Sequence, residues 1–515
     1  MFFWGGKMGN YKQNIDISYK EELYVKENSF IGRKQKHKEL PVFEHEKGKL
    51  PMPIWQGHEN EIEAYYKAWE IAFSNISNPE EHSTFISPFI DTAFNGNLFM
   101  WDSAFILMFG KYGDNIFKFQ ETLDNFYAHQ HMDGYISREL IEKNGTDRFT
   151  RFDPSSTGPN ILPWCEWEYY CMYRNEERLK QVFPPLLAYH RWLKEFRTWP
   201  DGSYWASGFA CGMDNLPRLQ PQYNIMFSHG HMVWVDTCFQ AILSCEMLIK
   251  IASVIGRSED VVELEEEKEN LSKYINEKLW DDDTKFYYDL WREDKLNGVK
   301  SVAPYWGLLT NEIPKERLDA FVQHLDNEKE FKRHHRVPVL SADHPDYHEE
   351  GDYWKGSVWA PTNYMILKGL TNQNYDKMAY EIACNDLKNV TECYKQTGTF
   401  WENYAPESSK RGSSSSADFV GWTGLIPISI LIEYVLGIQR GESENEIVWK
   451  INRCEKHGIK NYPINNSTVT LVCEERENIM QKPQVTIESD VPVKVKCIWE
   501  DGDFVIINNE KELTK

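Results

Sequence analysis

Two neighbouring helical segments of opposite character place the strongest constraint on the fold of this chain. Residues 231–255 are apolar on nearly every side, as a helix buried on two faces is. Residues 258–279 follow directly and need only one buried stripe, because they carry the glutamates Glu263, Glu265, Glu266, Glu267 and Glu269. A buried inner helix followed by an outer helix, repeated along a chain, is the pattern of an (α/α) toroid.

Helical periodicity recurs along the chain, roughly in pairs. It predicts helices over residues 59–76, 101–111, 115–129, 161–174, 176–198, 231–255, 258–279, 301–310, 315–326, 357–370, 373–397 and 420–437. We therefore expect a mainly α fold, an (α/α)6 toroid. Because no repeat of fixed period is visible, an α-solenoid and a helical bundle stay open as alternatives.

The character of the chain changes at both ends of this helical part. Residues 1–58 are polar and rich in Lys, and we expect an irregular segment that covers the toroid. Residues 59–440 would form the toroidal domain. Residues 441–515 predict a C-terminal β-sandwich-like domain, because Val, Ile and Thr alternate between turn residues at 446–452, 467–473, 484–488, 493–499 and 504–507.

Charge and aromatic content narrow the class of partner. The net charge of -22 argues against nucleic acid and anionic membranes, since phosphate contacts need clustered Lys and Arg. Aromatic residues make up 14% of the chain, and many lie beside Gly, Asp, Asn or Pro rather than at helical spacing. Rings in polar loops suit the apolar faces and hydroxyls of sugars, so we expect a small carbohydrate as partner. The oligomeric state is left open.

Nothing in the sequence calls for a metal, a cofactor or export. The ten cysteines show no zinc spacing, so we predict no metal site, no disulfide framework and no cofactor. The apolar patch at the N-terminus is too short for a signal peptide, and the longest apolar run, 425–438, falls short of a bilayer span. We expect a cytoplasmic protein.

Two carboxylates stand out because both lie on long loops among aromatic side chains. Asp214 follows Trp205, Phe209 and Met213 and precedes a proline, and Glu402 follows Trp401. A carboxyl group in apolar surroundings resists ionisation, which raises its pKa as a general acid at neutral pH requires. The alternative for Asp214 alone is an ordinary aromatic-rich turn.

Three further loop stretches combine rings with charged groups, at residues 95–102, 133–139 and 351–364. If all five stretches lie at one end of successive helical hairpins, they form one pocket. Glycoside hydrolysis with inversion needs two carboxyl groups in such a pocket, one to protonate the leaving oxygen and one to activate water.

Four motifs in chain order resemble glycoside hydrolase family 63. They are Gly-Met-Asp-Asn-x-Pro-Arg at 212–218, Tyr-Trp-Lys-Gly-x-Val-Trp at 353–359, Glu-Asn-Tyr at 402–404 and Gly-Trp-Thr-Gly-Leu at 421–425. The resemblance implies an inverting, exo-acting hydrolase of an α-glucoside or α-mannoside, with Asp214 as general acid and Glu402 as general base. It also implies that the terminal sugar is lined by Trp101, Asp102, Arg218, Trp354, Lys355, Trp359 and Trp422.

The sequence departs from the family pattern at three positions. Leu216 stands where Ser is common, Lys355 where Arg is common, and Ala405 where Asp usually follows. Lys cannot reproduce the bidentate fork of Arg. These departures bear on the substrate more than on the reaction.

Two other functions fit the same features. His229 and His231 could exchange protons at a sugar carbon in an epimerase or a polysaccharide lyase, although two histidines that hold the Asp214 loop are the simpler interpretation. A carbohydrate-binding protein without catalysis would keep the aromatic rings and need neither carboxylate.

Overall fold

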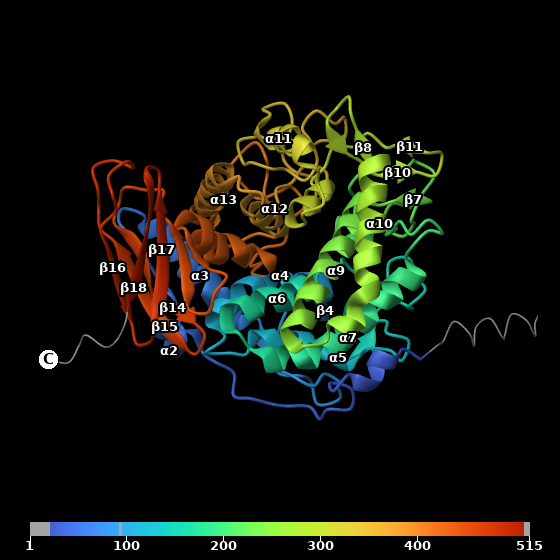
Figure 1. Cartoon of the computed structure of the whole chain (residues 1–515), viewed down its shortest axis with the longest axis horizontal. Helices are drawn as coiled ribbons and strands as arrows, with labels where there is room; N and C mark the ends of the chain where they lie inside the picture. The colour runs from blue at the N-terminus through green and yellow to red at the C-terminus, as the bar shows by residue number, and fades with distance from the viewer. Residues whose placement is uncertain (1–20, 92–94, 509–515) are drawn as a thin grey trace, which may run out of the picture.

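The computed structural model describes residues 21–91 and 95–508 and consists of a body of helices with a group of strands at one side (Figure 1). The inner helices contact one another in chain order and the last contacts the first, which closes a ring of α4 (Met100–Gly110), α6 (Leu162–Tyr173), α9 (Val235–Ile255), η6 (Ala303–Leu309), α12 (Ala360–Asn372) and η8 (Trp422–Leu425). The 3-10 helix η8 continues directly into η9 (Ile426–Val435). This closed ring excludes an open α-solenoid for the described part of the chain.

The outer helices alternate with the inner ones along the chain. They are α3 (Glu59–Ser74), α5 (Asp124–Ala128), α7 (Glu176–Phe196), α10 (Val262–Lys278), α11 (Lys315–Gln323) and α13 (Asp376–Thr397). All 11 residues of α4 are buried, whereas α10 buries only Leu264, Glu267, Leu271 and Ile275. The predicted contrast between 231–255 and 258–279 is confirmed, because α9 lies in the inner ring and α10 packs on its outside.

Several of the predicted helices differ in type from the observed elements, 115–129 and 420–437 most clearly. Residues 115–129 form the short 3-10 helix η4 (Phe119–Leu123) and α5 rather than one long helix. Residues 420–437 form η8 and the π-helical η9, whose first turn contains Pro427. Apolar periodicity located both segments and could not distinguish these helix types.

The C-terminal part and the early strand β1 form two four-stranded sheets, β1-β14-β15-β16 and β12-β13-β17-β18. The strands are β1 (Met52–Trp55), β12 (Ile438–Arg440), β13 (Glu446–Lys450), β14 (His457–Ile464), β15 (Ser467–Cys473), β16 (Val485–Ser489), β17 (Val493–Trp499) and β18 (Gly502–Asn508). Sequence reasoning missed β12 and β14. Residues 1–58 were expected to be irregular, yet β1 lies within them and pairs antiparallel with β14. Strand β1 lies at the edge of its sheet and therefore tolerates Pro53, which donates no hydrogen bond to a neighbouring strand. Residues 1–20 lie outside the described residues.

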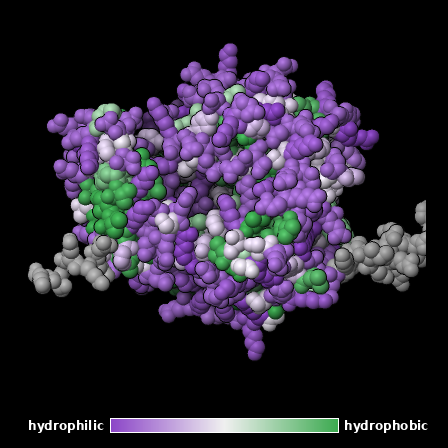
Figure 2. All heavy atoms as spheres, in the orientation of Figure 1, coloured by the Kyte–Doolittle hydropathy of each residue, from purple (hydrophilic) through white to green (hydrophobic). Residues whose placement is uncertain are grey.

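The helix α9 is long and apolar enough to cross a membrane by composition, but 67% of the qualifying window is buried inside the protein. Its apolar character is explained by its position in the inner ring, with α6, α7, α10 and η6 packed around it. The surface seen in Figure 2 is mostly hydrophilic, with an apolar area over the C-terminal strands, where Val505 and Ile507 of β18 are exposed.

Candidate active site

A cavity of about 520 Å³ brings together six of the nine residues that the sequence predicted to form the site. Those lining it are Trp101, Asp102, Asp214, Trp354, Glu402 and Trp422. They come from loops and helix starts far apart in the chain, and the ring of inner helices places them together. The prediction that the aromatic loops share one pocket is therefore met for these residues.

The Asp214 loop is shaped by one short helix and two glycines. In α8 (Gly208–Cys211), the Ser207 hydroxyl accepts a hydrogen bond from the Ala210 N–H, and the helix ends at Gly212 with a φ of 77°. A Cβ at Gly208 would lie 2.4 Å from the backbone oxygen of Asp214, so only glycine allows this close approach. The turn places Asp214 on the wall of the cavity.

Asp214 has the acidity of a general acid. Burial raises its pKa to about 7, the Arg138 guanidinium opposes the rise, and the charge of Glu402 adds to it. At neutral pH a substantial fraction of Asp214 therefore carries the proton that a leaving oxygen needs.

Glu402 lies in a more polar setting on the same cavity. Burial raises its pKa, but the Ser416 N–H donates to Oε2 at 3.2 Å and the Tyr353 hydroxyl to Oε1 at 3.3 Å, and both favour the ionised form. The indole N–H of Trp422 donates to the Glu402 backbone oxygen at 2.9 Å and fixes the loop. Two carboxyl groups in different environments hold protons with different strength, as acid–base chemistry requires.

The first turn of α4 contributes Trp101 and Asp102. Burial, together with the nearby charge of Asp91, raises the pKa of Asp102 well above its usual range. The buried Trp101 Nε1 has no hydrogen-bond partner among residues 21–91 and 95–508, although its side chain lines the cavity. An unpaired buried N–H at a cavity wall is suited to donate to a ligand hydroxyl.

Arg218 does not line the cavity, which corrects its assignment to the sugar subsite. Its side chain is 1% exposed and lies between Asp236 and Asp289, with all four hydrogen bonds at 2.5–2.8 Å. Its place in the family motif suggested a sugar contact. In the structure the guanidinium instead compensates the charges of two buried carboxylates.

Lys355 and Trp359 are the other two predicted residues that lie outside the cavity lining. Lys355 is half-buried on the same loop as Trp354. Trp359 is fully buried and stacks on Trp354, with ring centroids 3.8 Å apart and an interplanar angle of 4°. Trp359 therefore packs against the side of Trp354 that faces away from the cavity and does not itself line the cavity.

Sequence reasoning missed two arginines that line the cavity. Arg138 lies within the stretch 133–139 that was singled out, and its guanidinium packs over Phe149 and Phe209 with an ion pair to Glu139 at 3.2 Å. Arg148 belongs to no motif and offered no signal. Together with Tyr353, these residues add cations and rings to the predicted set.

The two histidines considered for a lyase or epimerase do not line the cavity. Their rings pack on each other at 4.7 Å, and both His229 and His231 also pack on Trp199. His229 packs on Trp205 as well, at the start of the segment that leads to Asp214, which agrees with the simpler interpretation.

Two carboxyl groups therefore share one aromatic cavity on a ring of helices. A model described as the mannosylglycerate hydrolase MGH1-like glycoside hydrolase domain matches residues 96–423, which include both Asp214 and Glu402. The chain belongs to this family.

Individual relatives are distant. The probable mannosyl-oligosaccharide glucosidase of Schizosaccharomyces pombe is 25% identical over 411 residues, 65% of this chain and 49% of that protein, so the chain spans about half of its length. The GH63 mannosylglycerate hydrolase of Thermus thermophilus, solved with glucose and with Tris and D-glycerate, superposes with a TM-score of 0.57 at 20% identity over 70% of this chain and 98% of that one. Neutral trehalase Nth1 of Saccharomyces cerevisiae gives a TM-score of 0.53 at 13% identity over 67% and 73%. These likenesses show that the fold is shared.

Proposed function

We propose that this chain is an inverting, exo-acting glycoside hydrolase that cleaves an α-glycosidic bond, built on an (α/α)6 toroid. The observation that carries the proposal is the pair Asp214 and Glu402 on one cavity, with the pKa of Asp214 raised to about 7. A volume of about 520 Å³ is in the range of sites for small ligands.

In the proposed reaction the proton of Asp214 passes to the glycosidic oxygen as the bond to the anomeric carbon breaks. Glu402 takes a proton from a water molecule on the opposite face of the sugar, and the water oxygen forms the new bond to that carbon. The α-glycoside thus yields a β-configured sugar and a free alcohol. Deprotonated Asp214 and protonated Glu402 then return to their starting states by exchange with solvent.

Two arginines at the cavity support a substrate whose leaving group carries a carboxylate. Arg138 and Arg148 both line the cavity, and a guanidinium binds a carboxylate through paired N–H donors. The Thermus relative is named a mannosylglycerate hydrolase and was solved with D-glycerate. The first candidate substrates are therefore α-mannosides and α-glucosides of this type. In them the sugar is joined to the hydroxyl of a hydroxy acid such as glycerate.

The experiment offers purified protein a panel of α-glucosides, α-mannosides, trehalose and glycerate glycosides, and follows the anomer released by NMR. Release of β-anomer by the wild type, lost in Asp214→Asn and Glu402→Gln and kept in the matched control Glu349→Gln, is the expected result. Glu349 is an exposed carboxylate outside the cavity.

Other outcomes would overturn the proposal. Tight sugar binding without turnover by all four proteins would identify a carbohydrate-binding protein. Activity that survives in both carboxylate variants but disappears in His229→Ala or His231→Ala would favour an epimerase or a lyase.

A further inference from the structure

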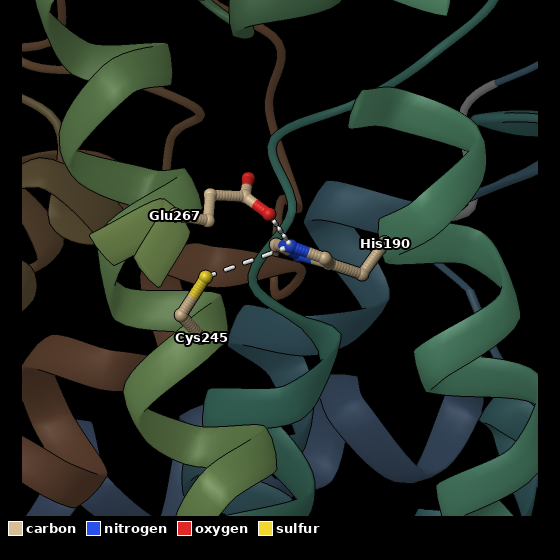
Figure 3. Close-up of side chains that lie close together, drawn as sticks. All are labelled: His190, Cys245 and Glu267. Carbon is tan, nitrogen blue, oxygen red and sulfur yellow. Dashed lines mark hydrogen bonds and ion pairs between the residues drawn. The ribbon is translucent and has the colours of Figure 1, made fainter. Parts of the chain in front are cut away.

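Three side chains of metal-binding types meet outside the cavity, between three helices of the body. His190 of α7, Cys245 of α9 and Glu267 of α10 converge in the interior, as Figure 3 shows. All three are buried, with exposed fractions of 0%, 0% and 9%. Their donor atoms lie within 4.8 Å of one another. No sequence motif joins them, which is why cysteine spacing predicted no metal site.

Two of the three distances between the donor atoms match those of a tetrahedral zinc site, and the third is within 4.8 Å. Bond lengths of about 2.0–2.1 Å to nitrogen and oxygen and about 2.3 Å to sulfur place tetrahedral ligands roughly 3.3 Å (N to O) and roughly 3.6 Å (N to S) apart. Here His190 Nε2 lies 3.3 Å from Glu267 Oε2 and 3.6 Å from Cys245 Sγ. The three side chains are thus already placed to share one ion.

Hydrogen bonding cannot satisfy both contacts of His190 Nε2 at once. His190 Nε2 faces both the carboxylate and the thiol, yet a ring nitrogen either carries a proton or accepts one. If it donates to Glu267 it cannot accept from the thiol of Cys245, and if it accepts from the thiol it faces the carboxylate with a lone pair. A cation between the three atoms would accept a lone pair from each.

The surrounding groups orient the ligands as in known zinc sites. His190 Nδ1 lies 3.0 Å from Ser244 Oγ and 3.3 Å from the Asn160 side-chain amide; when Ser244 accepts the ring proton from Nδ1, the Nε2 lone pair is free. The Tyr204 hydroxyl donates to Glu267 Oε1 at 2.5 Å and leaves Oε2 for the ion. Lys194 Nζ lies 2.9 Å from Oε2, but this side chain is 43% exposed and can turn to solvent.

An ion can reach the site from the surface. Glu267 and Lys194 both line an outer groove of about 790 Å³ between α7 and α10. The carboxylate therefore connects the groove to the buried imidazole and thiol.

We propose that His190, Cys245 and Glu267 bind a zinc ion, with water in the fourth position. On binding, the thiol of Cys245 gives its proton to solvent and coordinates as thiolate. Thiolate, imidazole and carboxylate together favour zinc over magnesium or calcium. The ion ties α7, α9 and α10 together and, through Tyr204, fixes the start of the segment that leads to Asp214.

The test uses the intact protein purified from zinc-supplemented cells and measures its metal content by mass spectrometry. About one zinc per chain is expected for a site with this ligand set. Removal by a chelator should lower the Tm, and zinc should restore it. Cobalt added to the chelated protein should give the near-ultraviolet sulfur-to-cobalt charge-transfer band and the visible bands of tetrahedral cobalt.

Cys245→Ser should abolish the charge-transfer band and the bound zinc. The matched control is Cys393→Ser, which changes an equally buried helical cysteine on α13 and should keep both. Wild-type protein that holds no zinc and gives no thiolate band with cobalt would overturn the proposal without reference to any variant. A band that persists in Cys245→Ser would overturn the ligand assignment.

Discussion

Replacing Arg218 by Met should destabilise the helical body and leave sugar recognition intact. The guanidinium bridges two carboxylates, donating to both oxygens of Asp236 at 2.7 and 2.8 Å and to both oxygens of Asp289 at 2.5 and 2.8 Å. Asp289 also accepts the Val235 N–H at the start of α9, so the cluster anchors an inner helix.

The magnitude follows from burial. Arg218 is 1% exposed and Asp236 is fully buried, so removal of the cation leaves carboxylates without a counter-charge in the interior. Breaking a buried ion pair from one side costs about 3–5 kcal/mol, a large part of the roughly 5–15 kcal/mol by which proteins are stable. Arg218→Lys keeps the charge but not the fork, so we expect a smaller loss. Arg218→Met combined with Asp236→Asn and Asp289→Asn should recover part of it.

Urea unfolding followed by tryptophan fluorescence measures the loss, and initial rates below the unfolding transition give KM. The control is Arg292→Met, whose side chain is exposed and should cost little. A KM that rises about tenfold (about 1.4 kcal/mol in binding free energy), together with a stability loss below about 1 kcal/mol, would show that Arg218 reaches the sugar and would refute the argument.

Three further predictions concern the cavity. Because Asp214 must be protonated and burial raises its pKa to about 7, kcat/KM should fall as pH rises through about 7; a rate that is flat between pH 6 and 8 (about one unit either side of that pKa) would contradict this. Tyr353→Phe should move the acidic limb of the pH profile upward, because burial raises the pKa of Glu402 and the phenol hydrogen bond opposes that rise; an unmoved limb would count against it. Gly212→Ala should lower kcat about 100-fold with an unchanged circular-dichroism spectrum, because the added Cβ would lie 3.1 Å from the Trp101 ring in a backbone with φ of 77°, and wild-type kcat would refute it.

The helical fold was predictable because a helix with one buried face carries apolar residues at regular spacing. The contrast between 231–255 and 258–279 follows from which faces touch solvent, and α9 and α10 confirm it. Strand β1 was not predictable from its own residues, because Pro51 and Pro53 argue locally against a strand. Its partner β14 lies some four hundred residues away in the chain.

The site was partly predictable for a related reason. Asp214 and Glu402 stand out because a carboxylate among aromatic residues is unusual, and both line the cavity. Arg218 shared the same motif, but sequence cannot show that Asp236 and Asp289 would surround it. Arg148 lies in a loop without any local signal, and only the three-dimensional arrangement places it at the cavity.

α-Glycosyl fluorides test most directly whether Asp214 and Glu402 divide the acid and base roles. Fluoride leaves without protonation, so Asp214→Asn should hydrolyse the α-fluoride of the preferred sugar while it fails on the matching O-glycoside. Glu402→Gln should fail on both, because activation of water is needed in each case. Equal loss of both activities in Asp214→Asn, or hydrolysis of the fluoride by Glu402→Gln at the wild-type rate, would contradict the account.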